Sequence, residues 1–216
     1  MKIVLKIGGS ISINENGPVE AYFRKLLPVI RQIKTRHRLI LCIGGGKFIR
    51  KYYKSIEKLG LKKEEMEWIA IELLRVNVRF LSSLLNMKPL YRLEEISTKT
   101  TGVIGGIKPG RSTDANAAYC AAKIKADLFV KLTNVDGIYD KDPRKHKDAR
   151  KLETLSFADL KKFSQSGKPG SYGILDRLAI ETITKHKIKT VIMNGKDPKN
   201  ILNAIKGERI GTLITN

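Results

Sequence analysis

Three clusters of glycine follow short apolar runs in this chain of 216 residues. The clusters are Gly8-Gly9 after residues 3–7, Gly44-Gly45-Gly46 after residues 39–43, and Gly105-Gly106 with Gly110 after residues 103–104. A strand that ends in glycine and turns into a helix presents free backbone N–H groups to an anion. One such turn is often only a tight turn, but three together predict a polyphosphate site. The motifs G-x-x-x-x-G-K-[ST] and G-x-G-x-x-G are both absent, which excludes the P-loop and dinucleotide-binding classes.

Cations and hydroxyls stand next to these glycines. Lys6 lies inside an apolar run, and because a buried lysine is costly, we expect it at the carboxyl end of a strand, near a transferring phosphoryl group. Lys47 and Arg50 fall in the first turn of a predicted helix, where a nearby anion would explain them, although a solvated helix face also would. Residues 108–114 combine two cations, two hydroxyls and Asp114. These residue types suit the binding of a phosphate group near Mg²⁺. They are equally typical of a loop that only caps the following helix.

Several acidic residues follow a later apolar run. Asp136 and Asp142 lie in turn signatures, and one acid of this region could contact a ribose or a metal. Tyr139 could stack on a base. Asp176 opens a predicted helix, so a capping role is at least as well supported locally as a catalytic one. The three histidines show no metal-ligand spacing, and Trp68, on an apolar helix face, is predicted to be core.

The elements that must position these residues alternate between strand and helix, which is typical of an α/β fold. Nearly continuous apolar runs predict parallel strands buried on both faces. We predict strands at residues 3–7, 39–43, 103–104, 128–132, 190–193 and 211–214, and helices at 19–34, 48–58, 64–85, 114–125, 159–163, 175–186 and 198–206. Residues 164–173 are predicted to be a loop rich in glycine, serine and proline.

Composition limits the partners. The net charge of +21 leaves nucleic acid, an anionic membrane or phosphorylated small molecules, and a basic loop at residues 141–151 contributes to it. Ordinary aromatic content of 6% and the lack of an RNA-binding signature argue against nucleic acid as a partner. No apolar run is long enough for a membrane span, and the start of the chain resembles a core strand rather than a signal peptide. Two cysteines among apolar or small residues indicate a reduced, cytoplasmic protein.

The motifs together resemble the amino acid kinase superfamily, and within it the archaeal-type uridylate (UMP) kinases. The resemblance runs nearly end to end and rests on the following segments: Lys6-Ile7-Gly8-Gly9-Ser10; Gly44-Gly45-Gly46-Lys47 with Arg50 and Tyr52; Trp68-Ile69 with Arg75 and Asn77; Gly105-Gly106; Pro109-Gly110-Arg111-Ser112-Thr113-Asp114-Ala115; Thr133-Asn134-Val135-Asp136-Gly137-Ile138-Tyr139 with Asp142-Pro143; Leu175-Asp176 with Ala179; and Gly211-Thr212.

The resemblance implies a three-layer α/β/α sandwich with a central, mostly parallel sheet, formed by one domain over residues 1–216. An acceptor-binding part would extend to about residue 125 and an ATP-binding part from about 126. The implied activity is ATP- and Mg²⁺-dependent phosphorylation of UMP to UDP, in pyrimidine nucleotide synthesis, by a homohexamer built from three dimers. The implied metal has no protein ligands of its own, because Mg²⁺ would be held mainly by nucleotide phosphates.

The resemblance also assigns roles. Implied catalytic residues are Lys6, Asp114 and Asp176. ATP would contact Lys6, Gly8, Gly9, Ser10, Gly46, Arg50, Thr133, Asn134, Tyr139 and Asp142. The acceptor would contact Gly45, Glu67, Ile107, Lys108, Pro109, Gly110, Arg111, Ser112 and Thr113.

Three departures from the family pattern keep other functions open. Glu67 replaces the usual aspartate, Arg111 and Ser112 replace a commoner His-Thr pair, and the segment between Leu85 and Gly105 is short. One alternative is a kinase of the same family that acts on another small phosphomonoester or on a carboxylate. A second is a non-catalytic member that binds nucleotide or nucleic acid.

Overall fold

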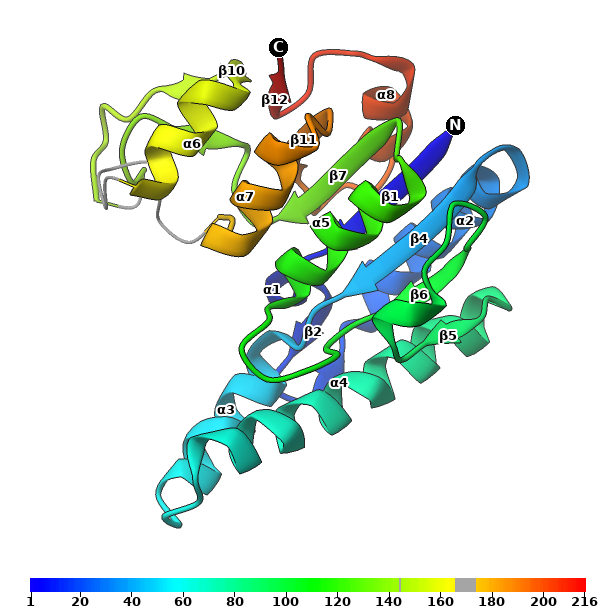
Figure 1. The fold of residues 1–216 in the computed structure, drawn as a ribbon, viewed down its shortest axis with the longest axis vertical. Coiled ribbons are helices and arrows are strands. Elements are labelled where there is room, and N and C mark those ends of the chain that lie inside the picture. The colour runs from blue at the N-terminus through cyan, green and yellow to red at the C-terminus, as the bar shows by residue number, and fades with distance from the viewer. Residues whose placement is uncertain (144, 166–173) are drawn as a thin grey trace.

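The computed structural model describes residues 1–143, 145–165 and 174–216, and its centre is one eight-stranded sheet (Figure 1). The strand order is β10 (Thr154–Ser156), β12 (Thr212–Thr215), β11 (Thr190–Asn194), β7 (Leu128–Thr133), β1 (Lys2–Ile7), β4 (Arg38–Ile43), β6 (Gly102–Ile104) and β5 (Pro89–Leu90). Every neighbouring pair in this sheet is parallel except β11 and β12, which run antiparallel. The prediction of a mostly parallel central sheet is confirmed.

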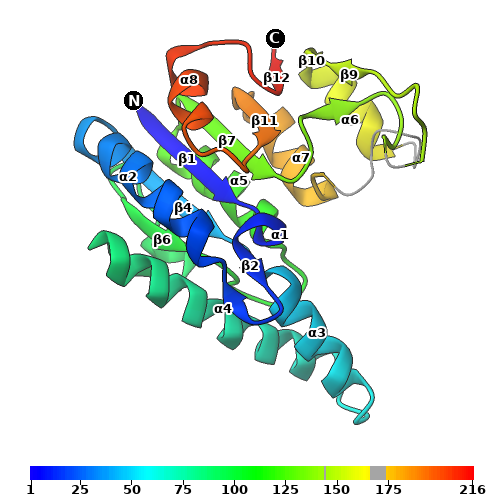
Figure 2. The same cartoon turned by 180° about the vertical axis from the view of Figure 1, so that it is seen from behind.

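Helices cover both faces of the sheet, because the alternate residues of each buried strand point to opposite sides. In β1, Ile3, Leu5 and Ile7 pack into one apolar core, whereas Val4 packs into a second. The first core is covered by α2 (Glu20–Arg36), α4 (Lys63–Leu85) and α8 (Asn200–Lys206). Figure 2 views the sheet from the side on which these helices lie. The second is covered by α5 (Thr113–Ile124), α6 (Phe157–Gln165) and α7 (Arg177–Lys185). The result is the expected three-layer sandwich.

The remaining elements are short. Two small antiparallel pairs are formed by β2 (Ile13–Asn14) with β3 (Gly17–Pro18) and by β8 (Ile138–Tyr139) with β9 (Lys151–Leu152). A four-residue helix, α1 (Gly9–Ser12), follows β1, and the 3₁₀ helix η1 (Leu93–Glu95) precedes β6. No helix among the described residues combines the length and apolar character required to cross a membrane. The predicted loop at 164–173 lies mainly outside the described residues, and the part that is described belongs to α6.

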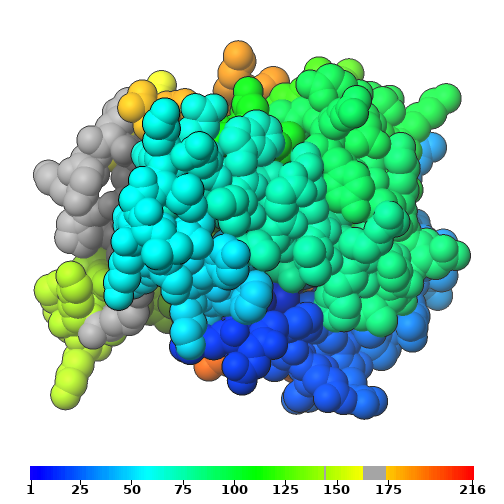
Figure 3. Space-filling view, turned by 90° about the horizontal axis from the view of Figure 1, so that it is seen from below, coloured from blue at the N-terminus to red at the C-terminus, as the bar shows by residue number. Residues whose placement is uncertain are grey.

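A helical hairpin of α3 (Gly46–Glu57) and α4 projects beyond the end of the sheet (Figure 1). Figure 3 shows this hairpin covering much of the face seen from below. Its apolar side chains are not all buried, and Trp68 on α4 is 42% exposed. The prediction that Trp68 belongs to the core was therefore wrong, because the outer side of the hairpin is itself apolar. Its exposed apolar side chains are Phe48, Tyr52, Leu59, Leu61, Trp68, Val76 and Leu84.

Candidate active site

The glycine turns meet at the carboxyl edge of the sheet, where parallel α/β folds place their ligands. There they border a cleft of about 990 Å³. β1, β4 and β7 are adjacent in the sheet, so the turns after these strands lie side by side. The cleft is thus lined by residues that are far apart in sequence, with Gly8, Gly44 and Thr133 among them.

Two of the turns touch through their backbones. A Cβ atom added to Gly9 would lie 2.1 Å from the Gly46 nitrogen, and one added to Gly46 would lie 2.2 Å from the Ile13 oxygen. Gly46 also has a φ of +65°, which side chains disfavour. These two positions therefore need glycine, and Gly46 at the start of α3 lines the cleft.

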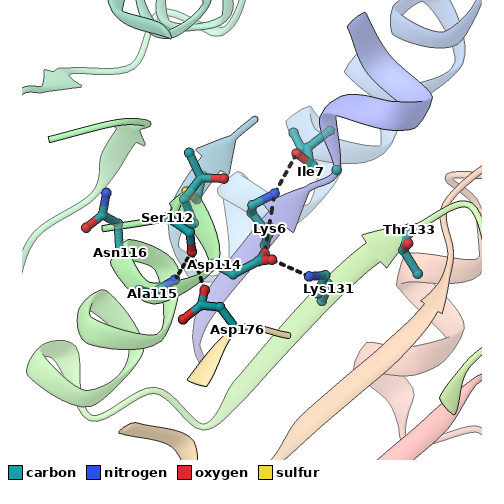
Figure 4. A network of polar contacts seen from close by, with 12 residues as sticks. Lys6, Ile7, Ser112, Asp114, Ala115, Asn116, Lys131, Thr133 and Asp176 are labelled. Atoms are coloured by element: carbon teal, nitrogen blue, oxygen red, sulfur yellow. Dashed lines mark hydrogen bonds and ion pairs between the residues drawn. The ribbon is translucent and has the colours of Figure 1, made fainter. Parts of the chain in front are cut away.

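A compact charged cluster of Lys6, Asp114 and Lys131 occupies the floor of the cleft (Figure 4). Lys6 and Lys131 are neighbours in the register of β1 and β7, and both are only about 5% exposed or less. The Lys6 ammonium lies 3.5 Å from Asp114 Oδ1, and the Lys131 ammonium donates a hydrogen bond to Asp114 Oδ2. Lys131 also donates to the carbonyl oxygen of Ile174. One carboxylate therefore holds two ammonium groups in place.

This arrangement keeps Asp114 ionised. Burial alone would raise the pKa of Asp114, but the Lys6 and Lys131 ammonium groups outweigh it and hold that pKa below its ordinary value. Burial lowers the pKa of Lys131, against the opposing attraction of the Asp114 carboxylate. At neutral pH Asp114 is therefore ionised and paired, so it is poorly suited to act as a general base and well suited to orient two cations.

Asp176 and Ser112 each cap a helix and also contact each other. Ser112 accepts a hydrogen bond from the backbone N–H of Ala115 at the start of α5, at 3.0 Å. Asp176 Oδ1 accepts one from Ala179 at the start of α7, also at 3.0 Å. The Ser112 hydroxyl donates to Asp176 Oδ2. The capping role considered for Asp176 is therefore present, and it does not exclude a functional one.

The segment before α5 is held from two sides. Glu67 Oε2 on α4 accepts a hydrogen bond from the backbone N–H of Gly110, at 2.8 Å. Arg111 does not extend freely, since its Nε donates to Asn116 Oδ1 at 3.1 Å and its guanidinium lies 5.5 Å from the centre of the Tyr119 ring. Both Glu67 and Arg111 line the cleft. The segment is thus positioned without any ligand.

Most of the expected site residues lie together on the cleft wall. Among the described residues, four of them are not part of the lining: Ile107, Tyr139, Asp142 and Asp176. Ile107 is buried in the second core, and Asp176 reaches the wall through Ser112. Those that line the cleft are Lys6, Gly8, Gly9, Ser10, Gly45, Gly46, Arg50, Glu67, Lys108, Pro109, Gly110, Arg111, Ser112, Thr113, Asp114, Thr133 and Asn134.

Lys131 is not among the site residues predicted from the sequence, although the sequence carries a signal for it. It interrupts the apolar run 128–132 in the same way that Lys6 interrupts the first strand. The register that places the two lysines side by side becomes visible only in the folded sheet. Cys42 also lies beside this cluster, but burial raises the pKa of its thiol to about 12, which excludes a thiolate nucleophile at neutral pH.

The comparisons with known proteins agree with this geometry. The profile of the amino acid kinase family matches residues 1–92 and 93–194. A uridylate kinase from Sulfurisphaera tokodaii is 39% identical, over 99% of both chains. The crystal structure of uridylate kinase from Archaeoglobus fulgidus covers 100% of both chains with a TM-score of 0.85 and 36% identity. The UMP kinase of Bacillus anthracis shares the fold, with a TM-score of 0.81, 20% identity and coverage of 99% of this chain and 95% of that one. The chain belongs to the amino acid kinase family.

Proposed function

We propose that this protein transfers the γ-phosphoryl group of ATP to UMP, which yields ADP and UDP. The observation that carries the proposal is the pair of lysine ammonium groups held on Asp114 at the floor of a glycine-lined cleft. Full-length relatives named uridylate kinase support UMP as the acceptor. The chain thus acts as a nucleoside monophosphate kinase.

The chemistry needs positioning and charge neutralisation rather than a covalent intermediate. Negative charge spreads over the oxygens of the phosphoryl group during in-line transfer. Lys6 and Lys131 supply two positive charges in a site from which water is largely excluded, where such interactions are strongest. Asp114 holds both lysines where they are needed and keeps their mutual repulsion from driving them apart.

The two nucleotides would occupy different ends of the cleft. We assign the ATP nucleoside to the part formed with residues from about 126 onward, and both the ATP phosphates and UMP to the part formed by residues up to about 125. ATP phosphates would lie on the turns after β1 and β4, and its nucleoside near the turn after β7, with the following contacts: Lys6, Gly8, Gly9, Ser10, Gly46, Arg50, Thr133, Asn134, Tyr139 and Asp142. UMP would contact Gly45, Glu67 and the segment of residues 107–113, including Arg111.

Mg²⁺ would accompany ATP and neutralise its phosphates. Among the described residues, no group of three or more His, Cys, Asp or Glu side chains is arranged to hold a metal. Asp114 Oδ1 is buried and accepts no hydrogen bond from the part of the chain that the structure describes, although Lys6 lies near it. This oxygen would accept a hydrogen bond from a water molecule bound to Mg²⁺, and the nucleotide phosphates would be the main ligands of the metal.

The proposal includes a homohexamer, built as three dimers, in the cytoplasm. The exposed apolar side chains of the α3–α4 hairpin support association between copies of the chain. Both cysteines are free and buried, which supports a reducing compartment. Light scattering coupled to size-exclusion chromatography would test the assembly, and a monomer at micromolar concentration would overturn this part.

A coupled assay of ADP release, run with each nucleoside monophosphate in turn, tests the activity. We expect release with UMP to exceed release with AMP, GMP and CMP. The Lys6→Ala variant should abolish it, whereas Lys162→Ala, which removes an exposed lysine of α6, should not. ADP release with another acceptor but none with UMP would overturn the substrate, and full turnover in Lys6→Ala would overturn the mechanism.

A further inference from the structure

Ser112 joins the starts of two helices that belong to different parts of the chain. Its oxygen accepts the Ala115 N–H of α5, while its proton is donated to Asp176, the capping residue of α7 (Figure 4). The other Asp176 oxygen is occupied by the Ala179 N–H. A serine hydroxyl has one proton to donate, so in this geometry that proton is committed to Asp176.

These contacts belong to a closed ring that runs through the charged cluster. From Ser112 the chain leads in two residues to Asp114, whose Oδ2 accepts from Lys131. Lys131 donates to the Ile174 carbonyl oxygen, and the chain leads in two residues to Asp176, which returns to Ser112. The ring therefore ties together the starts of α5 and α7 and the middle of the sheet.

We propose that Ser112 is a positioning residue that closes this ring and so fixes the Lys131 ammonium group for phosphoryl transfer; the inference rests on the proposed function. Lys131 is held by one oxygen from each side of the ring, those of Asp114 and Ile174. The Ser112–Asp176 hydrogen bond joins these two sides directly at the helix starts, in addition to the packing of α5 against α7 in the second core. Without it, the start of α7 loses its direct tie to the start of α5, and the Ile174 oxygen is held less firmly against Lys131.

This role replaces the UMP contact assigned above to Ser112 as part of residues 107–113, while the other residues of that segment keep theirs. An acceptor ligand would bind the UMP phosphate directly, so its loss would raise the KM for UMP. A positioning residue acts on Lys131, so its loss lowers kcat and leaves the KM for UMP nearly unchanged. Displacing a catalytic group by about 1 Å can cost about 100-fold in rate, so the effect is large enough to measure.

The experiment compares Ser112→Ala with Ser112→Thr and with a matched control, Ser156→Ala. Ser156 has the same chemistry elsewhere, since its hydroxyl accepts the Asp159 N–H at the start of α6 and donates to the Asp159 carboxylate. Both alanine variants lose a helix cap and should show a similar small fall in Tm. We expect Ser112→Ala to lose about 10- to 100-fold in kcat, Ser112→Thr to recover most of it, and Ser156→Ala to keep wild-type kcat.

A double-mutant cycle with Asp176→Ala tests the contact itself. If Ser112 acts through Asp176, the double variant has the same kcat as Asp176→Ala alone, and the two substitutions are also non-additive in Tm. The proposal is overturned if Ser112→Ala raises the KM for UMP at unchanged kcat, if Ser156→Ala loses as much activity, or if the cycle is additive in both quantities. The double-mutant cycle in Tm needs no substrate, so it tests the Ser112–Asp176 contact even if the wild-type protein is inactive with UMP. Such inactivity would refute the proposed function but not the contact.

Discussion

Replacing Lys131 by methionine removes one of the two cations that neutralise Asp114. The side chains of Lys131 and Asp114 are 6% and 18% exposed, so the carboxylate would remain largely buried with Lys6 at 3.5 Å as its only ion-pair partner among the described residues. Breaking a buried pair in this way costs about 3–5 kcal/mol, and the remaining Lys6 contact favours the lower end. In a chain of this length, about 3 kcal/mol lowers Tm by about 6–12 °C.

The same substitution should impair catalysis through a separate effect. Loss of a fixed charge that stabilises the transferring group reduces kcat by about 100- to 1000-fold. The triple variant Lys6→Met/Lys131→Met/Asp114→Asn separates the two effects, since it leaves no charge of the cluster buried without a partner and should restore Tm without restoring kcat. Thermal unfolding and the ADP-release assay measure both quantities. A Lys131→Met protein as stable as the wild type, or with kcat reduced only a few-fold, would refute this reasoning.

Three further changes test other parts of the site. Gly9→Ala places a methyl group against the Gly46 backbone. We expect the free energy of unfolding, measured with denaturant, to fall by about 1–3 kcal/mol and the KM for ATP to rise. An unchanged KM for ATP would contradict the close approach of the two turns. Asp114 has a lowered pKa, so its contribution to stability is present above about pH 3.9 and is lost as pH falls through the folded-state pKa. The difference in unfolding free energy between wild type and Asp114→Asn should therefore shrink from pH 5 to pH 2. A difference that stays constant over this range would refute the lowered pKa of Asp114. Glu67→Ala frees the Gly110 N–H and should raise the KM for UMP more than the KM for ATP, while Glu67→Gln, which can still accept that bond, should change little.

The layers of the fold could be predicted from the sequence because the apolar runs at 3–7, 39–43 and 103–104 each end in glycine. The predicted strand at 39–43 and helix at 64–85 differ from β4 and α4 by one residue at the start. The order of the strands could not be predicted in the same way, since it depends on which runs pair across long stretches of chain. The antiparallel direction of β12 beside β11 is one result of that pairing.

The glycine turns and Lys6 could be predicted as site residues because each of them stands out within its own short segment of sequence. The site was not predictable where a side chain depends on a distant partner. Lys131 gains its place from Lys6, which lies beside it in the sheet but far from it in sequence, and Glu67 is directed by the Gly110 N–H, 43 residues further along the chain. Trp68 was misjudged because a helix face can be apolar without being covered within one chain.

The central position of β1 has a consequence for how the chain is made. β1 is synthesised first, but its neighbours are β4 on one side and β7 on the other, and β7 begins only at residue 128. Parallel pairing across such a distance is slow, and domains emerge from the ribosome with the N-terminus first. The edge of β1 that later receives β7 must therefore stay without that partner until residues 128–133 have been made, and the charged cluster of Lys6, Asp114 and Lys131 can assemble only when that edge closes.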